Sequence, residues 1–393
     1  FPDLEPMPFS KDEKYLYVKP SGVSLAAITE KDFVKMERSI IRECFAWGDF
    51  DNASEREARV KSLMAYAVAP GSCGRPSVEA PLHELMDFKF VVHLHPAMVN
   101  GMTCGKNGAA KCAELFPEAL FVEYVDPGFT LAKVVYDRVA EYKKSSGKAP
   151  AVIFLQNHGV FVGGNSDDEI RSAYSNIMTV LADFYKSANI DPAPATAGEP
   201  DMETVMNIAP QLRGWLASAG SVVSVRSAGA FLPAAGPLTP DHIVYAKSFA
   251  LICDEPTEEA IKAFEAKNGY KPKVVAIPNK AVFAAGNNAN SAATVMALAM
   301  DAVRVEKLTE VFGGVNYLSD AHREFIENWE VESYRSKVAA GSAKALSGKV
   351  AESAFVVIDA ITATEYKTRV MADMLKALNV EGKALIVIPE VDK

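Results

Sequence analysis

Several features that would place a protein in a specialised class are missing from this chain of 393 residues. No window comes near 18 uninterrupted apolar residues, so we expect no transmembrane helix. The first 20 residues lack the basic and apolar regions of a signal peptide, and also an initiator Met, so we expect the chain to be trimmed or truncated there. The net charge of −9 argues against a broad nucleic-acid surface, which needs clustered Lys and Arg.

Cysteine and histidine are both scarce. The five cysteines form no CxxC pair, which fits free thiols in a reducing cytoplasm better than a disulfide framework. Paired glycines in VFVGGN and FGGVNYL lack the GxGxxG spacing of a dinucleotide site and are expected to be turns. With 49% hydrophobic and 23% charged residues, the composition is that of a soluble globular protein of two or three domains.

Apolar strand-like runs alternate with amphipathic segments over about residues 10–190, which predicts an α/β domain. Strands are expected within 13–22, 88–97, 119–126 and 149–164. Helices are expected over 30–40, 54–69, 78–88, 107–117, 130–147 and 166–189. Ser166 and Glu169 have the spacing of a capping box at the start of the last helix.

A proline-containing segment at 189–200 is the best candidate for a linker, and an internal similarity spans it. The stretches that begin at Val152 and Val274 share a strand, an Asn, a Val-Phe pair and a long helix at an offset of 122 residues. Lys280 stands in the second stretch where His158 stands in the first, so any metal chemistry should be lost there. The similarity predicts a degenerate repeat, with convergent strand–turn–helix patterning as the alternative.

Three histidines and one glutamate form the candidate chemical site. His93 and His95 end an apolar run, and side chains two apart on a strand share a face, so both imidazoles can reach one metal ion. His158 follows a second apolar run, and three imidazoles match a catalytic zinc site. Glu79, in a turn rich in Gly and Pro, is suited to act as general base. On spacing alone, histidines that are merely satisfied by hydrogen bonds remain an equal alternative.

The motifs YVKPSG, RPSVEAPLH, HLHP and NHGVFVGG, in this order, resemble the class II aldolase/adducin family over about residues 15–190. LTPDHIVY, GYKPKVV and FIENWEVESYR resemble the aldolase half of rhamnose-utilisation bifunctional aldolase/dehydrogenase proteins, up to about residue 340. The resemblance implies a three-layer α/β/α fold and a zinc-dependent lyase in a homo-oligomer. Its substrate would be a small-molecule sugar 1-phosphate, such as rhamnulose or fuculose 1-phosphate, cleaved to dihydroxyacetone phosphate and an aldehyde through a metal-stabilised enediolate.

The same resemblance assigns roles to single residues. By motif position, the zinc ligands are His93, His95 and His158, the catalytic acid/base is Glu79, and the residues that contact the substrate phosphate are Ser21, Gly22 and Ser77. The chain departs from the family in lacking a Gly-rich stretch before residue 14 and in having Val78 where some relatives have a second Ser. A different divalent transition metal, a sugar-phosphate epimerase or decarboxylase on the same scaffold, and a non-catalytic adducin-like binding module are the alternatives.

The three other histidines and the C-terminal segment carry separate expectations. His83 is expected to be structural or to support a ligand, His242 to lie in a loop that is structural or borders the site, and His322 to lie on the surface. Two apolar runs with a helical segment between them predict a βαβ tail of uncertain origin. The predicted domains are a zinc domain at 1–190, a degenerate aldolase-like domain at 200–340 and the tail at 341–393. We expect a cytoplasmic enzyme with no nucleic-acid or membrane partner.

Overall fold

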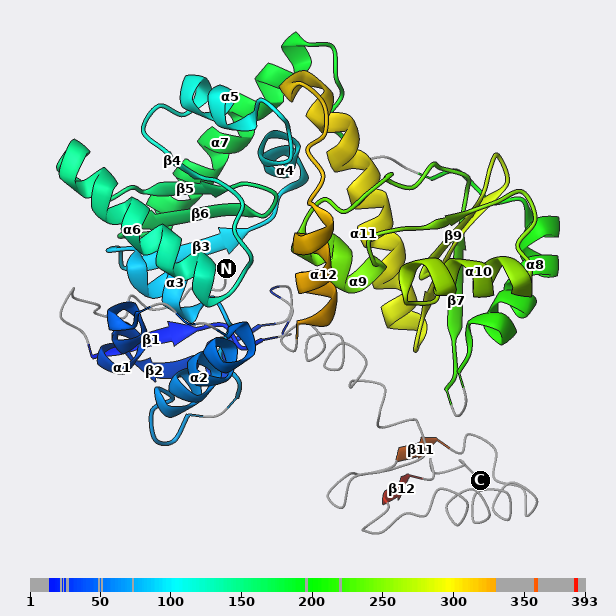
Figure 1. Cartoon of the computed structure of the whole chain (residues 1–393), viewed down its shortest axis with the longest axis horizontal. Coiled ribbons are helices and arrows are strands. Elements are labelled where there is room, and N and C mark those ends of the chain that lie inside the picture. Colours follow the sequence, from blue (N-terminus) through cyan, green and yellow to red (C-terminus); the bar gives the residue numbers. More distant parts are fainter. Residues whose placement is uncertain are drawn as a thin grey trace, which may run out of the picture. The chain divides into compact units, whose positions relative to one another are not determined.

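The structure is a computed structural model. It describes residues 14–329, apart from 22, 24, 26, 27, 49, 51, 73, 195, 196, 219 and 220, together with 357–359 and 385–387. The chain divides into two compact units, Phe1–Arg335 and Ser336–Lys393. The larger unit holds two four-stranded sheets, each with its own helices (Figure 1). We call its described residues up to 187 the first module and those from 197 to 329 the second module.

The sheet of the first module has the strand order β3-β6-β5-β4, with β6 antiparallel to both neighbours and β4 parallel to β5. Its strands are β3 (Phe90–Leu94), β4 (Leu120–Val122), β5 (Val152–Leu155) and β6 (Gly159–Gly164). Because successive side chains point to opposite faces, Ile153 enters one core and Phe154 the other. The helices on the Ile153 face are α3 (Ala80–Leu85) and α6 (Phe129–Ser146), and those on the Phe154 face are α4 (Ala97–Thr103), α5 (Gly108–Leu115) and α7 (Asp167–Ser187). The module is therefore a three-layer α/β/α arrangement.

The N-terminal part of the first module is a separate two-stranded sheet of β1 (Tyr15–Val18) and β2 (Val34–Glu37). The prediction of a helix across 30–40 is wrong at β2. Val34 and Met36 are both fully buried and alternate with partly exposed residues, so strand pairing with β1 prevails over helical spacing. The other elements of this part are η1 (Glu30–Asp32), α1 (Arg38–Arg42), η2 (Glu43–Ala46) and α2 (Ala53–Tyr66).

The start of α7 follows the predicted capping pattern in part. The Ser166 hydroxyl accepts a hydrogen bond from the Glu169 backbone N–H at 3.2 Å, as an N-cap residue should. The Glu169 carboxylate accepts from the backbone N–H of Asn165 rather than from that of Ser166. The helix therefore begins where the sequence predicts, with the reciprocal bond displaced by one residue.

The second module has the strand order β7-β10-β9-β8, again with β10 antiparallel to both neighbours and β8 parallel to β9. Its strands are β7 (Ser224–Ala228), β8 (Leu251–Ile252), β9 (Val274–Ile277) and β10 (Ala281–Gly286). Its helices are α8 (Met202–Leu216), α9 (Pro240–Ala246), α10 (Glu258–Asn268), α11 (Ala289–Leu308) and α12 (Asp320–Asn328). Leu212 and Ile261 anchor α8 and α10 on one face of the sheet, and Ala246 and Val295 anchor α9 and α11 on the other.

The two sheets agree in register as well as in strand order. Corresponding partner pairs are Val152 with Val162 in the first sheet and Val274 with Ala284 in the second. Each residue of the second pair lies 122 positions beyond its counterpart. The turn between the paired strands holds an Asn in the left-handed region in both, Asn157 at φ 52° and Asn279 at φ 61°. Strand order, pairing sense and turn conformation are thus the same in both modules.

Helix α11 packs into both modules. Val295 and Met296, near its start, lie in a core of the second module. Val305 and Leu308, near its end, lie in the first module's core with α4 and α7. The short helix η3 (Thr309–Phe312) follows directly and adds Phe312 to that core. The two modules therefore share continuous apolar packing.

In the smaller unit the structure describes two short strands, β11 (Val357–Asp359) and β12 (Leu385–Val387), which pair in parallel. The helix expected between them lies outside the described residues. Among the helices that are described, none combines the length and the apolar character needed to cross a membrane.

Candidate metal centre

The three predicted histidines come together at one end of the strands of the first sheet, where β3 stops and β5 turns back into β6. His93 lies in β3, and His95 follows one residue after that strand ends. His158 lies in the turn between β5 and β6. Because Leu94 pairs with Val160, this turn lies beside His95, and a Cβ atom at Gly159 would stand 2.4 Å from the His95 ring. The His-Gly dipeptide thus allows the two chain segments to approach.

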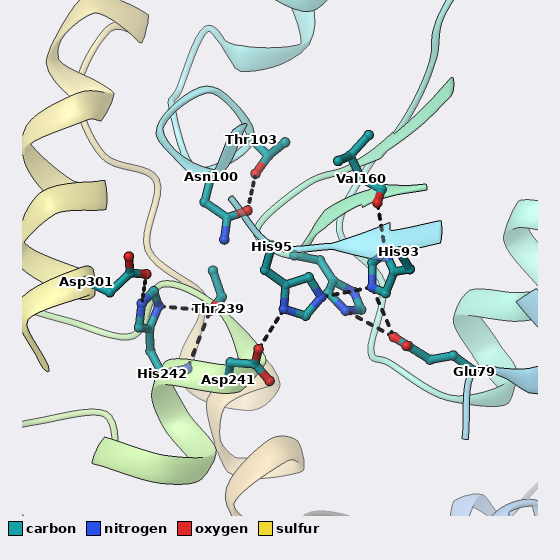
Figure 2. Close-up of polar contacts among 11 residues, drawn as sticks. Glu79, His93, His95, Asn100, Thr103, Val160, Thr239, Asp241, His242 and Asp301 are labelled. Carbon is teal, nitrogen blue, oxygen red and sulfur yellow. Dashed lines mark hydrogen bonds and ion pairs between the residues drawn. The ribbon is translucent and has the colours of Figure 1, made fainter. Parts of the chain in front are cut away.

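The imidazoles of His93, His95 and His158 point toward one another. Each offers a ligand nitrogen, and these atoms all lie within 4.8 Å of one another. The Nε2 atoms of His93 and His95 are 2.8 Å apart (Figure 2). Ligand nitrogens of a tetrahedral zinc ion with Zn–N bonds of 2.0–2.1 Å lie roughly 3.3 Å apart. Small side-chain movements therefore suffice for the three nitrogens to hold a zinc ion.

Hydrogen bonding assigns the tautomers of two of these rings. The His93 Nδ1–H donates to the Val160 carbonyl at 3.1 Å, and the His95 Nδ1–H donates to the Asp241 carboxylate at 2.7 Å. Both Nε2 atoms are then unprotonated and face each other as lone pairs. A positive charge between the rings satisfies this arrangement, so the donor set fits a metal ion.

Burial keeps the ligand rings neutral. Desolvation is the largest influence on the His93 ring and lowers its pKa to about 4, against an opposing effect of Glu79. Desolvation also lowers the pKa of His158. Neutral imidazoles bind a metal ion without first losing a proton, so both rings are ready to act as ligands at neutral pH.

Glu79 lies beside the histidines, at the N-cap position of α3. Its Oε1 atom is 3.4 Å from the His93 Nε2 and 3.3 Å from the His158 Nε2. Desolvation is the largest influence and by itself raises the pKa of this carboxyl group, but the neighbouring His93 and His158 together outweigh it and hold the pKa well below its usual value. Glu79 is therefore a carboxylate at neutral pH, able to accept a proton next to the three rings.

The predicted phosphate-contacting serines lie on two paired segments. Pro20 and Pro76 form a β-bridge, and Ser77 N–H donates to the Lys19 carbonyl, so Ser21 and Ser77 are on neighbouring strands of chain. Both serines are buried, and the Ser21 hydroxyl has no hydrogen-bond partner among the described residues. The Ser77 hydroxyl accepts from the backbone N–H of Glu79 at 3.2 Å, which links this segment to the candidate site. Gly22 lies outside the described residues.

The other histidines take structural positions. His83 lies edge-on against Phe161, and burial lowers its pKa to about 4. His322 is partly exposed, and its Nδ1 atom is 2.8 Å from the Asp126 carboxylate. The expectation of a loop at His242 is wrong, because the capping residue Thr239 with a Pro at the first position starts a helix there.

Two residues of the site were not singled out by sequence reasoning. Asp241, from α9, reaches His95 of the first module. Asn157 precedes His158 and donates through Nδ2 to the carbonyls of Leu238 and Asn316 at 2.9 and 2.8 Å. A signal for Asn157 exists in the sequence, because Asn tolerates the left-handed conformation and recurs at the matching position 279.

The family comparison agrees with this geometry. Residues 7–182 match the family model described as Class II Aldolase and Adducin N-terminal domain, so the chain contains a class II aldolase/adducin domain.

Similar proteins were also found. The chain is 22% identical over 393 residues to a Bacillus subtilis (strain 168) protein named Uncharacterized oxidoreductase YuxG, over 87% of this chain, and it spans 55% of the length of that relative. A class II aldolase domain of a conserved protein from Thermoplasma acidophilum is 24% identical over 43% of this chain and 74% of that one, with a TM-score of 0.37. An L-fuculose 1-phosphate aldolase is 15% identical over 50% of this chain and 80% of that one, with a TM-score of 0.31.

Proposed function

We propose that this chain is a zinc-dependent class II aldolase that cleaves a sugar 1-phosphate, such as rhamnulose or fuculose 1-phosphate, to dihydroxyacetone phosphate and an aldehyde. The observation that carries the proposal is the convergence of three imidazoles beside an ionised glutamate. His93, His95 and His158 offer three nitrogens within 4.8 Å, which leaves a coordination position for substrate. Zinc is the preferred metal because three histidines are a known ligand set for catalytic zinc, and other divalent transition metals bind the same donors.

The residues of the site divide the chemistry between them. His93, His95 and His158 would hold the metal ion, which when bound would act as a Lewis acid on the substrate oxygens. Glu79 would accept a proton from, or return a proton to, the substrate carbon that becomes the nucleophile in the enediolate. Its carboxylate is ionised and lies next to the ligand rings.

The phosphate of the substrate would lie at the paired segments that hold Ser21 and Ser77. The buried Ser21 hydroxyl lacks a partner among the described residues, and an anion would satisfy it. The Ser77 hydroxyl already accepts one hydrogen bond and keeps its proton for donation. We include Gly22 in the proposed phosphate site on the basis of its motif position alone.

The wider arrangement is part of the same proposal. We propose a zinc domain at 1–190, a degenerate copy of it at 200–340 and a βαβ tail at 341–393, related to the aldolase half of rhamnose-utilisation bifunctional aldolase/dehydrogenase proteins. The common strand order and register of the two sheets support the repeat, and the exposed Lys280 at the position of His158 supports its loss of metal chemistry. A cytoplasmic homo-oligomer is the expected setting of such an enzyme.

Metal analysis tests the site. The full chain and the variants His95→Ala and His322→Ala are purified, loaded with zinc, freed of excess metal and analysed by elemental mass spectrometry. We expect about one zinc ion per chain in the wild type and in His322→Ala, and a large loss in His95→Ala. His322→Ala is the matched control because it removes a histidine outside the cluster. A wild type that retains no metal would refute the proposal.

A cleavage assay then tests the chemistry. Release of dihydroxyacetone phosphate is measured with rhamnulose and fuculose 1-phosphates, and release of dihydroxyacetone is measured with the unphosphorylated sugars. Glu79→Gln should keep its zinc and lose about 10²–10⁴-fold in rate, because the amide cannot accept the proton. Loss of zinc in Glu79→Gln would make Glu79 a ligand instead of a base. Epimer or carbon dioxide as product, without dihydroxyacetone phosphate, would refute the aldolase assignment.

A further inference from the structure

Asp241 belongs to the second module but contacts a candidate ligand of the first. Its Oδ2 atom lies 2.7 Å from the Nδ1 of His95, although 146 positions separate the two residues in the chain (Figure 2). The side chains are 31% and 23% exposed, so the contact is partly shielded from water. A carboxylate at Nδ1 fixes both the tautomer and the orientation of the ring and makes its Nε2 more basic toward a metal ion.

Several contacts hold Asp241 in place. The Thr239 hydroxyl caps α9 and lies 2.8 Å from the His242 Nδ1, and the His242 Nε2–H donates to the Asp301 carboxylate on α11 at 3.1 Å (Figure 2). His242 and Thr239 are both buried. The start of α9 is thus tied to α11, and α11 is itself packed against α4 of the first module. Asp241 therefore lies in the first turn of a helix that is held in place by α11, and not in an open loop.

The second module also supports the turn that carries His158. Asn157 donates through Nδ2 to Leu238, just before α9, and to Asn316, before α12. The backbone N–H of Asn316 in turn donates to the Cys104 carbonyl at 2.7 Å. His93, by contrast, has its Nδ1 partner within the first module, at Val160. Two of the three candidate ligands therefore depend on contacts from the second module.

We propose that the second module completes the metal centre within the same chain, with Asp241 as the positioning residue of His95. This inference rests on the proposed function, because it needs the three histidines to bind a metal ion. It adds a role for the second module, which has Lys280 instead of a histidine at the turn that matches His158. That role is to position a metal ligand of the first module. Asp241 acts through His95 and is not assigned a step in the reaction.

Zinc affinity of the full-length chain tests this inference without any substrate. Asp241→Ala and Asp241→Asn are compared with the wild type by competition against a chromophoric chelator. We expect Asp241→Ala to bind zinc about 10–100-fold more weakly, because the His95 ring loses its fixed orientation and its anionic partner. Asp241→Asn should lose less, since its amide oxygen still accepts from the His95 Nδ1–H. Partial rescue by the amide separates a role at the ring from a general effect on folding.

Asp201→Ala is the matched control. Asp201 is also an acidic residue of the second module near the start of a helix, where it caps α8, but it lies outside the candidate metal cluster. We expect the zinc affinity of this variant to equal that of the wild type. Circular dichroism and thermal unfolding of the metal-free proteins check that each variant is folded, and Asp241→Asn serves if Asp241→Ala is not.

The outcomes separate the two levels of the proposal. Wild-type zinc affinity in both Asp241 variants would overturn the role of Asp241 and leave the aldolase proposal standing. An equal loss in Asp201→Ala would also overturn it, because the effect would then be general to the module. A wild type that binds no zinc would overturn both the inference and the proposed function.

Discussion

Lys273 lies just before β9, and its side chain is partly buried beside the end of α9. Its ammonium group donates to the Tyr245 carbonyl at 3.0 Å. Burial is the main influence and Lys247 the second, and together they lower the pKa of Lys273 to about 8 from the ordinary 10.5. Folding therefore moves the positive charge of Lys273 from water into a less polar environment.

The sign of the resulting pH dependence follows from proton binding. Between pH 8 and 10.5 the unfolded chain holds the Lys273 proton and the folded chain has lost it, so stability rises with pH in this window. The full penalty below pH 8 is at most about 3 kcal/mol. Between pH 7.5 and 9.5, this group alone should add about 2 kcal/mol to the free energy of unfolding.

Lys273→Met removes the partly buried charge and one hydrogen bond worth about 1 kcal/mol. We expect the variant to be more stable than the wild type by about 2 kcal/mol at pH 7.5 and nearly equal to it at pH 9.5. Urea unfolding at the two pH values, followed by circular dichroism, measures this difference. Lys186→Met, which changes an exposed lysine near the end of α7, is the matched control and should follow the wild type at both pH values.

A variant at Lys247 tests whether the neighbouring charge contributes to the low pKa of Lys273. Lys247→Met removes the neighbouring positive charge, so the pKa of Lys273 should rise and the gain in stability between pH 7.5 and 9.5 should shrink. The reasoning is refuted if Lys273→Met and the wild type differ by the same amount at both pH values, because the lysine would then titrate alike in the folded and unfolded chain.

Two other substitutions probe packing and buried charge by the same urea assay. Gly101→Ala in α4 would place a Cβ atom within van der Waals overlap of the Tyr185 hydroxyl, so we expect a loss of about 3 kcal/mol, whereas Gly214→Ala in α8 has open space and should gain about 0.5–1 kcal/mol. Equal effects at the two glycines would contradict the close approach of α4. Glu84→Gln should cost about 2–4 kcal/mol, because this carboxylate is 1% exposed and pairs with two arginines of α1 at 2.6 and 2.7 Å. Glu114→Gln, which breaks an exposed pair with a lysine of the same helix, should change stability by less than about 0.5 kcal/mol, and a similar loss in both would argue against burial as the cause.

The sequence predicted those parts of the fold that depend on local pattern. The apolar runs around Val152 and the long helix after Ser166 lie where periodicity placed them, because each makes its own hydrophobic face. The strand β2 was missed because four residues with two buried side chains also fit a helical spacing over 30–40. Only pairing with β1, whose partners lie about 20 residues away, decides between the two.

In the candidate site, too, the residues placed by local sequence pattern could be predicted and those placed by contacts distant in the chain could not. His93 and His95 could be placed on one face because strand geometry is local, and His158 because it ends another apolar run. Asp241 could not be assigned to His95, since the contact depends on how α9 packs against the first module, which no spacing encodes. The helix at His242 could have been predicted from the Thr-Pro pair that starts it.

The position of α11 in two cores has a consequence for how the protein is made. A nascent chain that has reached residue 187 has all strands of the first sheet, yet Leu308 and Phe312, which close one of its cores, are still to be translated. At 5–20 residues per second, the intervening stretch of about 120 residues takes roughly 6–24 s to synthesise. During that interval the surface of α4 that α11 covers stays exposed, as does Tyr185 of α7, which contacts Phe312, so the growing chain can bind chaperones or other nascent chains there until α11 and η3 are synthesised.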